Sequence, residues 1–240
     1  MKYFLTNPAF PDFFAKQLAP YGFCIPIRPF HKLDEPVNAH PDMLAVNIGG
    51  KLFIHADDIH LAAALSKQNI PFSLSQAPVG AKYPQDIALN LFTVKKYLFA
   101  NVAHASADVL EYARLCEYEL VNVAQGYAKC STLLLDEAVI TADTGIYRTA
   151  DTGIYRAAKE RGIDALLISP GNIGIEKYDT GFIGGASAKI AEGKVAVFGN
   201  IEKHPDGENI LGFAKKHDTQ IISLGHSALF DYGGIVCADA

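Results

Sequence analysis

The sequence predicts an α/β fold in which five ββαβ units form a pseudosymmetric, five-bladed propeller. The first observation is a repeat of about 45 residues that places a turn residue before a short apolar strand, at Asp42, Asp86, Cys130, Gly185 and Gly234. The second is that only six residues follow Gly234, so the fifth unit needs strands from the N-terminus. Pairing of the N- and C-terminal segments would close the ring and remove the exposed edges of an open array.

The first unit shows the pattern that the others follow. Residues 43–56 hold two apolar runs around Gly49 and Gly50, which is typical of a tight β-hairpin. Residues 57–69 begin with capping aspartates and carry one apolar face, which predicts a helix. The apolar run at 70–75 predicts the last strand of the unit.

The remaining units repeat this order of hairpin, helix and strand. We expect these elements in unit two at 87–101, 106–118 and 119–124, in unit three at 131–143, 155–162 and 163–170, and in unit four at 187–200, after Asp206 and at 219–225. Unit five is divided, with its first strand expected within 233–240 and its second strand, helix and last strand at 2–7, 10–22 and 23–29.

The third unit contains a tandem duplication, TADTGIYR at 141–148 and again at 149–156. The extra copy follows the second strand of the hairpin, so we expect it near the end of the ring that carries Asp42 and Cys237. Two interpretations stay open. The segment could act as a lid there, or it could be a longer surface loop, because lengthening a loop costs little free energy.

The composition is that of one globular domain spanning residues 1–240. Hydrophobic residues make up 50% and charged residues 20%, which is ordinary for a chain able to bury a core. No apolar run approaches 18 residues and the start lacks the features of a signal peptide, so we expect a cytoplasmic protein with no membrane partner. The net charge of −5 argues against nucleic acid as a partner. The 4 widely spaced cysteines are expected to be free thiols.

The starts of the five first strands are expected to crowd one end of the ring, which we call the mouth. Loops gathered at one end of a closed fold are a usual place for a site. The residues expected there are His40, Asp42, Asp86, Asn90, Cys130, Ser131, Gly184, Gly185, Gly234 and Cys237.

Five closed ββαβ units with a Gly-Gly-x-x-Cys segment near the C-terminus resemble the pentein, or guanidino-modifying-enzyme, superfamily. Residues 233–237 are similar to the nucleophile segment of agmatine deiminases, and residues 40–55 are similar to the Arg-Asp strand of arginine deiminases. The resemblance covers the whole chain and is closest to an uncharacterised bacterial branch. It implies a cysteine-dependent hydrolase or transferase of a guanidino compound, with a small molecule as its partner.

Two segments depart from the superfamily pattern. The superfamily enzymes carry His-x-Asp or His-x-Glu in unit four, where the histidine handles protons, but residues 181–186 hold neither a histidine nor a carboxylate. Unit three is similar to their Glu-Gly-Gly-Asp segment but begins Gln125-Gly126-Tyr127. These departures favour the alternative of a non-catalytic ring that binds a ligand, as ribosome anti-association factors of the same fold do.

Attack on a guanidinium carbon needs a thiolate, carboxylates that hold the planar cation, and an acid or base for proton transfer. The resemblance assigns the first two roles to Cys237 and Asp42. His226 or His40 would replace the missing histidine. In the alternative interpretation Cys237 packs in the core and Asp42 caps a turn.

The other mouth residues are expected to bind the substrate. Asp86 offers a second carboxylate for a cation, and Cys130 is either a second thiol or a core residue. The expected substrate-binding set is Asp86, His40, Asn90, Cys130, Gly184 and Gly185.

The 8 histidines lack metal-ligand spacing and residues 181–189 lack the end of a phosphate loop, so no metal and no cofactor are expected. An unrelated repeat protein with an incidental cysteine is the third possibility.

Overall fold

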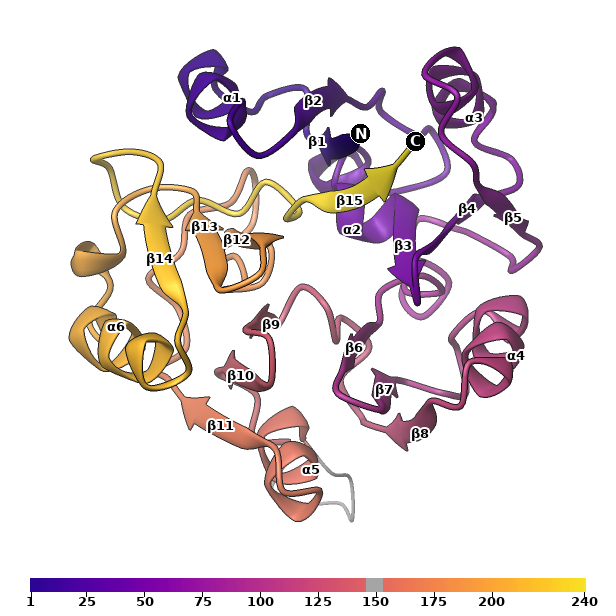
Figure 1. Cartoon of the computed structure of the whole chain (residues 1–240). Coiled ribbons are helices and arrows are strands. Elements are labelled where there is room, and N and C mark those ends of the chain that lie inside the picture. The colour runs from indigo at the N-terminus through magenta and orange to yellow at the C-terminus, as the bar shows by residue number, and fades with distance from the viewer. Residues whose placement is uncertain (146–152) are drawn as a thin grey trace.

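The computed structural model describes residues 1–145 and 153–240, which form five ββαβ units arranged in a ring (Figure 1). Each unit contributes one three-stranded sheet. The first strands lie toward the centre of the ring and the longer helices lie on its outside. The five-bladed α/β propeller predicted from the repeat is therefore confirmed.

Unit one shows the strand directions that every unit shares. Strand β3 (Ala45–Ile48) runs antiparallel to β4 (Lys51–His55). Helix α3 (Ile59–Lys67) then returns the chain so that β5 (Ser73–Ser75) pairs with β4 in parallel. A crossover helix is the usual way to bring two parallel strands together.

Local sequence explains both connections of this unit. Gly49 and Gly50 have φ angles of 57° and 85°, the left-handed conformation that a two-residue hairpin turn requires. Asp58 caps helix α3, because its carboxylate accepts a hydrogen bond of 3.0 Å from the amide of Leu61. The hairpin and helix expected in this unit both form.

The other elements follow the predicted order. Unit two comprises β6 (Phe92–Val94), β7 (Tyr97–Ala100), α4 (Ala107–Leu115) and β8 (Glu119–Asn122), unit three β9 (Thr132–Leu134), β10 (Ala138–Thr141), α5 (Ile154–Glu160) and β11 (Asp164–Leu167), and unit four β12 (Ser187–Ala191), β13 (Lys194–Val197), α6 (Gly207–Lys216) and β14 (Gln220–Ser223). Short helices that the repeat did not predict are η1 (Glu35–Val37), α2 (Pro41–Leu44) and η2 (Ile201–Lys203). Among the described residues, no helix has the length and apolar character needed to cross a membrane.

The two ends of the chain build unit five together. Strand β1 (Lys2–Thr6) pairs antiparallel with β15 (Val236–Asp239) and parallel with β2 (Phe23–Pro26), while α1 (Asp12–Leu18) forms the crossover. The terminal amino group of Met1 also donates a hydrogen bond of 2.9 Å to the carbonyl of Ala240. This pairing closes the ring as predicted.

The hydrophobic core is distributed around the ring, with one buried cluster between each pair of neighbouring units. Between units one and two, for example, Val46, Leu98 and Val109 pack together. Between units four and five, Phe4 and Phe198 share a cluster. Burial of apolar surface therefore holds each unit against both neighbours and fixes the first strands around the axis.

The duplication in unit three lies between β10 and α5. The carboxylate of Asp143, in the first copy, accepts hydrogen bonds from the amides of Gly145 at 3.1 Å and Ile154 at 2.7 Å. Ile154 belongs to the second copy and starts α5. The lid interpretation depends on residues 146–152, which lie outside the described residues.

Candidate functional site

The mouth of the ring contains a cavity of about 420 Å³, which we call the mouth cavity. Its polar walls include His40, Asp86, Cys130 and Asp231, and its aromatic walls are Tyr83, Tyr127, Tyr178 and Phe182. The volume is in the range of small-ligand sites.

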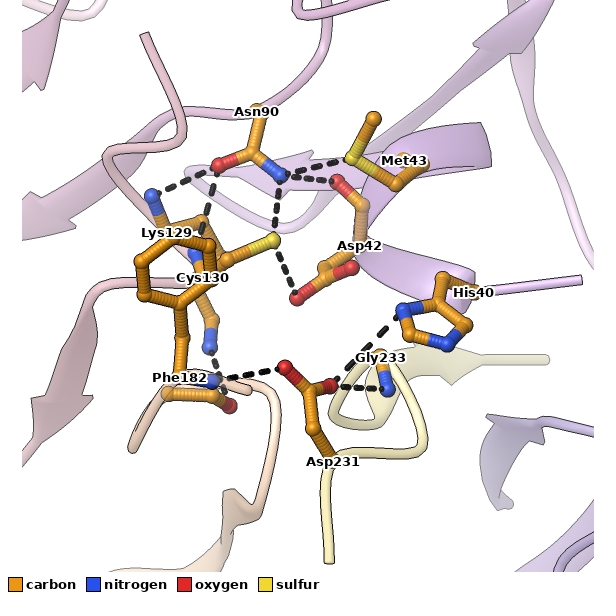
Figure 2. A network of polar contacts seen from close by, with 10 residues as sticks. His40, Asp42, Met43, Asn90, Lys129, Cys130, Phe182, Asp231 and Gly233 are labelled. Carbon is orange, nitrogen blue, oxygen red and sulfur yellow. Dashed lines mark hydrogen bonds and ion pairs between the residues drawn. The ribbon is translucent and has the colours of Figure 1, made fainter. Parts of the chain in front are cut away.

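A buried polar network joins the first three units behind this cavity (Figure 2). The thiol of Cys130 donates a hydrogen bond of 3.1 Å to Asp42 Oδ2, and Asn90 Nδ2 lies 2.8 Å from the same sulfur. Asn90 Nδ2 also donates to the main-chain carbonyl of Asp42 at 3.1 Å, while Asn90 Oδ1 accepts from the amide of Lys129 at 2.9 Å. Asn90 therefore orients both the thiol and the turn of α2 that carries the carboxylate.

Asp231 brings a second buried carboxylate beside this network (Figure 2). It lies in the loop before β15, and its oxygens accept hydrogen bonds of 2.9 Å from the amides of Phe182 and Gly233. Its Oδ1 lies 3.7 Å from His40 Nδ1. Residues 181–186 of unit four contain no acid. Asp231, from unit five, places a carboxylate against this segment through its bond to Phe182.

Asp86 supplies a third carboxylate in another part of the wall. Its Oδ2 accepts a hydrogen bond of 2.6 Å from the hydroxyl of Tyr127, whose ring stacks on Phe182 with centroids 6.0 Å apart. The other oxygen, Oδ1, is buried and has no hydrogen-bond partner among the described residues, and the same holds for Asp42 Oδ1. Buried polar atoms of native proteins are rarely left unpaired, so both oxygens are open to a partner that the described residues do not supply.

Burial controls the ionisation of the inner groups. It raises the pKa of Asp42 to about 7, an effect that Lys129 opposes and Asp231 reinforces. Burial also raises the pKa of Asp231, and burial together with the two carboxylate charges raises the pKa of the Cys130 thiol well above its usual range. The pKa of His40 is lowered by burial, which favours the neutral imidazole. The inner site therefore combines buried acids with a protonated thiol.

Cys237 lies in a different cavity. It is the second residue of β15 and lines, with Ala45, Asn47 and Lys189, a separate cavity of about 420 Å³ along the first strands. Its thiol donates a hydrogen bond of 3.4 Å to the carbonyl oxygen of Lys189. Burial raises the pKa of this thiol. The structure thus does not bring Cys237 into the cavity that Asp86, Cys130 and Asp231 share.

A protein-family model matches most of the chain. The model of DUF6873, a family of unknown function, matches residues 9–236. The protein belongs to this family. No curated protein matches the sequence.

Solved structures similar to this DUF6873 protein have the pentein fold. Agmatine deiminase from C. jejuni superposes with a TM-score of 0.53 at 9% identity, over 93% of this chain and 87% of that one. A dimethylarginine dimethylaminohydrolase, in its adduct with S-methyl-L-thiocitrulline, gives a TM-score of 0.53 at 8% identity, over 92% of each chain. The pentein fold implied by the sequence resemblance is confirmed, and at these identities the likeness extends to the fold alone.

Gly184 and Gly185 have no side chain, and this lets the backbone of Lys129 and the carboxylate of Asp231 lie close to them at the mouth of this DUF6873 ring. A Cβ on Gly184 would lie 2.2 Å from the carbonyl oxygen of Lys129, and one on Gly185 would lie 2.0 Å from Asp231 Oδ1. A side chain at either position would displace the groups that form the inner site. Both glycines therefore act through the backbone.

The structure gathers some of the residues expected at the site and separates others. His40, Asp42, Asp86, Asn90 and Cys130 lie around the mouth cavity or directly behind it. His226 is exposed on the loop after β14 and is not part of that wall. No group of three or more His, Cys, Asp or Glu side chains within residues 1–145 and 153–240 is arranged to hold a metal ion.

Sequence reasoning did not identify Asp231 or the aromatic walls. Asp231 precedes Gly233 by two positions and accepts the hydrogen bond of its amide, a turn that Asp-x-Gly sequences commonly form. That turn was the available signal, because it places a carboxylate just before the closing strand. Tyr83, Tyr127 and Phe182 each lie three positions before the turn residue of their own unit, so the repeat itself offered a signal for this wall. Tyr178 lies further from the unit-four turn and has no such signal.

Proposed function

We propose that the protein binds a small organic cation, a guanidino or amine compound, in the mouth cavity. The observation that carries the proposal is the pair of buried carboxylate oxygens, Asp42 Oδ1 and Asp86 Oδ1, that have no partner among the described residues. A buried ionised carboxylate is costly unless it is paired, and a cation with several N–H donors would supply both the charge and the hydrogen bonds. The names of the structural neighbours, an agmatine deiminase and a dimethylarginine dimethylaminohydrolase, support the guanidino class.

Isothermal titration calorimetry tests this function with methylguanidine, agmatine and butylamine at pH 8, where Asp42 is ionised. We expect at least one of them to bind, and Asp42→Asn to weaken that binding about tenfold or more, as loss of a charged hydrogen-bond partner does. Asp12→Asn, which neutralises an exposed acid on α1, is the matched control and should bind like the wild type. Absence of binding by all three cations rejects the proposal.

A second candidate function is hydrolysis of a guanidino compound with Cys130, rather than Cys237, as the nucleophile. The specific observation is that the Cys130 thiol lines the mouth cavity and already donates its proton toward Asp42. In this scheme the thiol proton passes to Asp42, and the sulfur forms a bond to the guanidinium carbon. One C–N bond then breaks, and the departing ammonia takes the proton back from Asp42. Water next attacks the thiouronium carbon and gives one proton to Asp42. The C–S bond then breaks, the sulfur takes the second proton of that water, the ureido product leaves, and Asp42 releases its proton to solvent.

The raised pKa of Cys130 sets the condition for this chemistry. A thiol held protonated by burial and by nearby carboxylates is a poor nucleophile. A bound guanidinium would offset those carboxylate charges and favour the thiolate. Catalysis would therefore depend on the substrate's own charge.

Covalent labelling distinguishes the two cysteines. We expect 2-chloroacetamidine, which carries the guanidinium-like charge, to modify Cys130 in preference to neutral iodoacetamide, and the label to disappear in Cys130→Ser. Cys116 is exposed and serves as the internal standard for general thiol reactivity. Modification at Cys237 instead would support the nucleophile that the sequence resemblance assigns. Labelling confined to Cys116 would leave binding as the function.

A further inference from the structure

The buried acids in the wall of the mouth cavity and directly behind it occupy two places with different partners. Asp42 and Asp231 form an inner pair, and the charge of Asp231 helps to raise the pKa of Asp42. Asp86 lies on the loop before β6 and has Tyr127 as its hydrogen-bond partner, so it forms a separate outer acid. Asp86 and Asp231 both line the same cavity, although they come from units two and five.

The wall between the two acid positions is aromatic. Tyr127 stacks on Phe182 with an angle of 30° between the rings, and Tyr83 lies 5.9 Å from Tyr127 between centroids. Met43 adds a thioether-bearing side chain to the same wall. Surfaces of this kind pack well against methylene groups and attract cations to the ring faces. A ligand that spans the cavity would therefore be apolar in its middle.

The positive charges of the protein offset these acids only in part: Lys129 opposes the rise in the pKa of Asp42 and of Asp231, but burial still raises both. His40 is buried and favours the neutral form. Lys82 is an exposed residue at the rim, and the ammonium of Lys129 lies 3.4 Å from the carbonyl of Gly184 and outside the cavity lining. A ligand with one positive charge would pair with one acid position and leave the other without a cation. Two positive charges would pair with both.

We propose that the ligand of the mouth cavity is a dication, with two cationic nitrogen groups joined by a short aliphatic chain. The inner pair, Asp42 and Asp231, holds one group, and Asp86 holds the other. This inference rests on the proposed binding of an organic cation and adds its chemical class. Asp86 then determines specificity, because it recognises the second charge.

Calorimetry with matched amines tests the second charge directly. The probes are 1,4-diaminobutane and 1,5-diaminopentane, compared with butylamine and pentylamine at pH 8 and low salt. We expect the diamine of the better length to bind about tenfold or more tightly than its monoamine, the effect of one additional charged hydrogen bond. Asp86→Asn should reduce that ratio to near one.

A merely structural role for Asp86 predicts another result, in which Asp86→Asn weakens monoamines and diamines by the same factor. Tyr127→Phe is the companion variant: it removes the hydroxyl that bonds to Asp86 but keeps the charge, so the preference for diamines should persist. If Asp86→Asn fails to fold, the wild-type ratio decides alone. Equal binding of monoamine and diamine to the wild type overturns the dication while the organic-cation site stands. Absence of binding by every cation removes both.

Discussion

The thiol of Cys130 donates a hydrogen bond of 3.1 Å to the buried carboxylate of Asp42, although 88 positions separate the two residues in the chain. Asn90, from the unit between them, contacts both. Each of the three residues precedes the first strand of its own unit, so the network exists only when three units close around one axis. Formation of this network therefore requires that units one, two and three pack around the same axis.

The first prediction concerns Asp42 and the stability of the fold. Its pKa is raised from 3.8 in the unfolded chain to about 7, so the folded state binds more protons between these values and stability falls as the pH rises through them. The loss is on the order of 4 kcal/mol by the usual conversion of a pKa difference into free energy. Asp42→Asn should show a smaller loss between pH 5 and pH 8 in urea unfolding. An identical pH dependence in both proteins would contradict the assignment.

His55 should act in the opposite direction over nearly the same range. Its ring Nε2 donates a hydrogen bond of 3.2 Å to the main-chain carbonyl of Met43, and burial lowers its pKa from 6.5 to about 4. The stability that this neutral histidine contributes is present above pH 6.5 and is lost as the pH falls toward 4. The Asp42→Asn variant lacks the opposing effect of Asp42, so its unfolding free energy should fall as the pH is lowered from 7 to 4.5. The double variant Asp42→Asn/His55→Asn should show a smaller fall. Urea titrations at pH 4.5 and pH 7 on both variants measure the difference.

A third prediction tests the close approach of Gly185 to Asp231. Gly185→Ala would force a Cβ to within 2.0 Å of Asp231 Oδ1, so we expect a loss of about 1–3 kcal/mol in unfolding free energy, typical of overpacking. Organic-cation binding should weaken as well, because Asp231 must move. Gly212→Ala is the matched control: the position lies within α6 and has no atom within 4 Å of the added Cβ. That change should stabilise the protein by about 0.5–1 kcal/mol. Equal stability of the two variants would argue against a packed inner site.

The repeat predicted the ring because the same local signals recur in every unit: a turn, two apolar runs and a capped helix. It also predicted which residues meet at the mouth, since His40, Asp42, Asp86, Asn90 and Cys130 all precede first strands. These residues approach one another as a direct consequence of the symmetry.

Symmetry also explains why Cys237 lies elsewhere. Gly234 is equivalent to Asp42, so the repeat aligns Cys237 with Ala45, three positions further along. Ala45 is the first residue of β3 and lines the same second cavity as Cys237. Residues inside a first strand lie further along the axis than the turn residues at the mouth. The motif likeness at residues 233–237 did not contain that information, because it fixes identity and spacing but not depth along the axis.

A fourth prediction concerns the two loops that meet over the mouth cavity. The hydroxyl of Tyr178 donates a hydrogen bond of 2.7 Å to Asp34, and Lys177 pairs with Glu35 at 2.5 Å. Tyr178→Phe should speed both association and dissociation of a bound cation in stopped-flow measurements, because the loops are then less firmly joined. Its unfolding free energy should change by less than about 0.5 kcal/mol, since exposed pairs contribute little.

Lys96→Gln provides the control for that experiment. It breaks a similar exposed pair, with Glu119 at 2.5 Å, in unit two and away from the cavity lining. Its binding kinetics should match those of the wild type. Unchanged kinetics in Tyr178→Phe would show that these contacts do not control access to the cavity.

The last prediction concerns the duplication in unit three. Deleting residues 149–156 leaves one copy of TADTGIYR, in which Asp143 precedes the isoleucine of that copy by three positions. In the full chain the carboxylate of Asp143 already accepts a hydrogen bond from Ile154, across eleven positions. An aspartate three positions before the amide that it binds is a normal helix cap, so the shortened chain can form the same contact locally. Because a shorter loop also costs less entropy on folding, we expect the deletion variant to unfold at the same urea concentration as the wild type or a higher one. A clear loss of stability would show that the second copy makes contacts on which unit three depends.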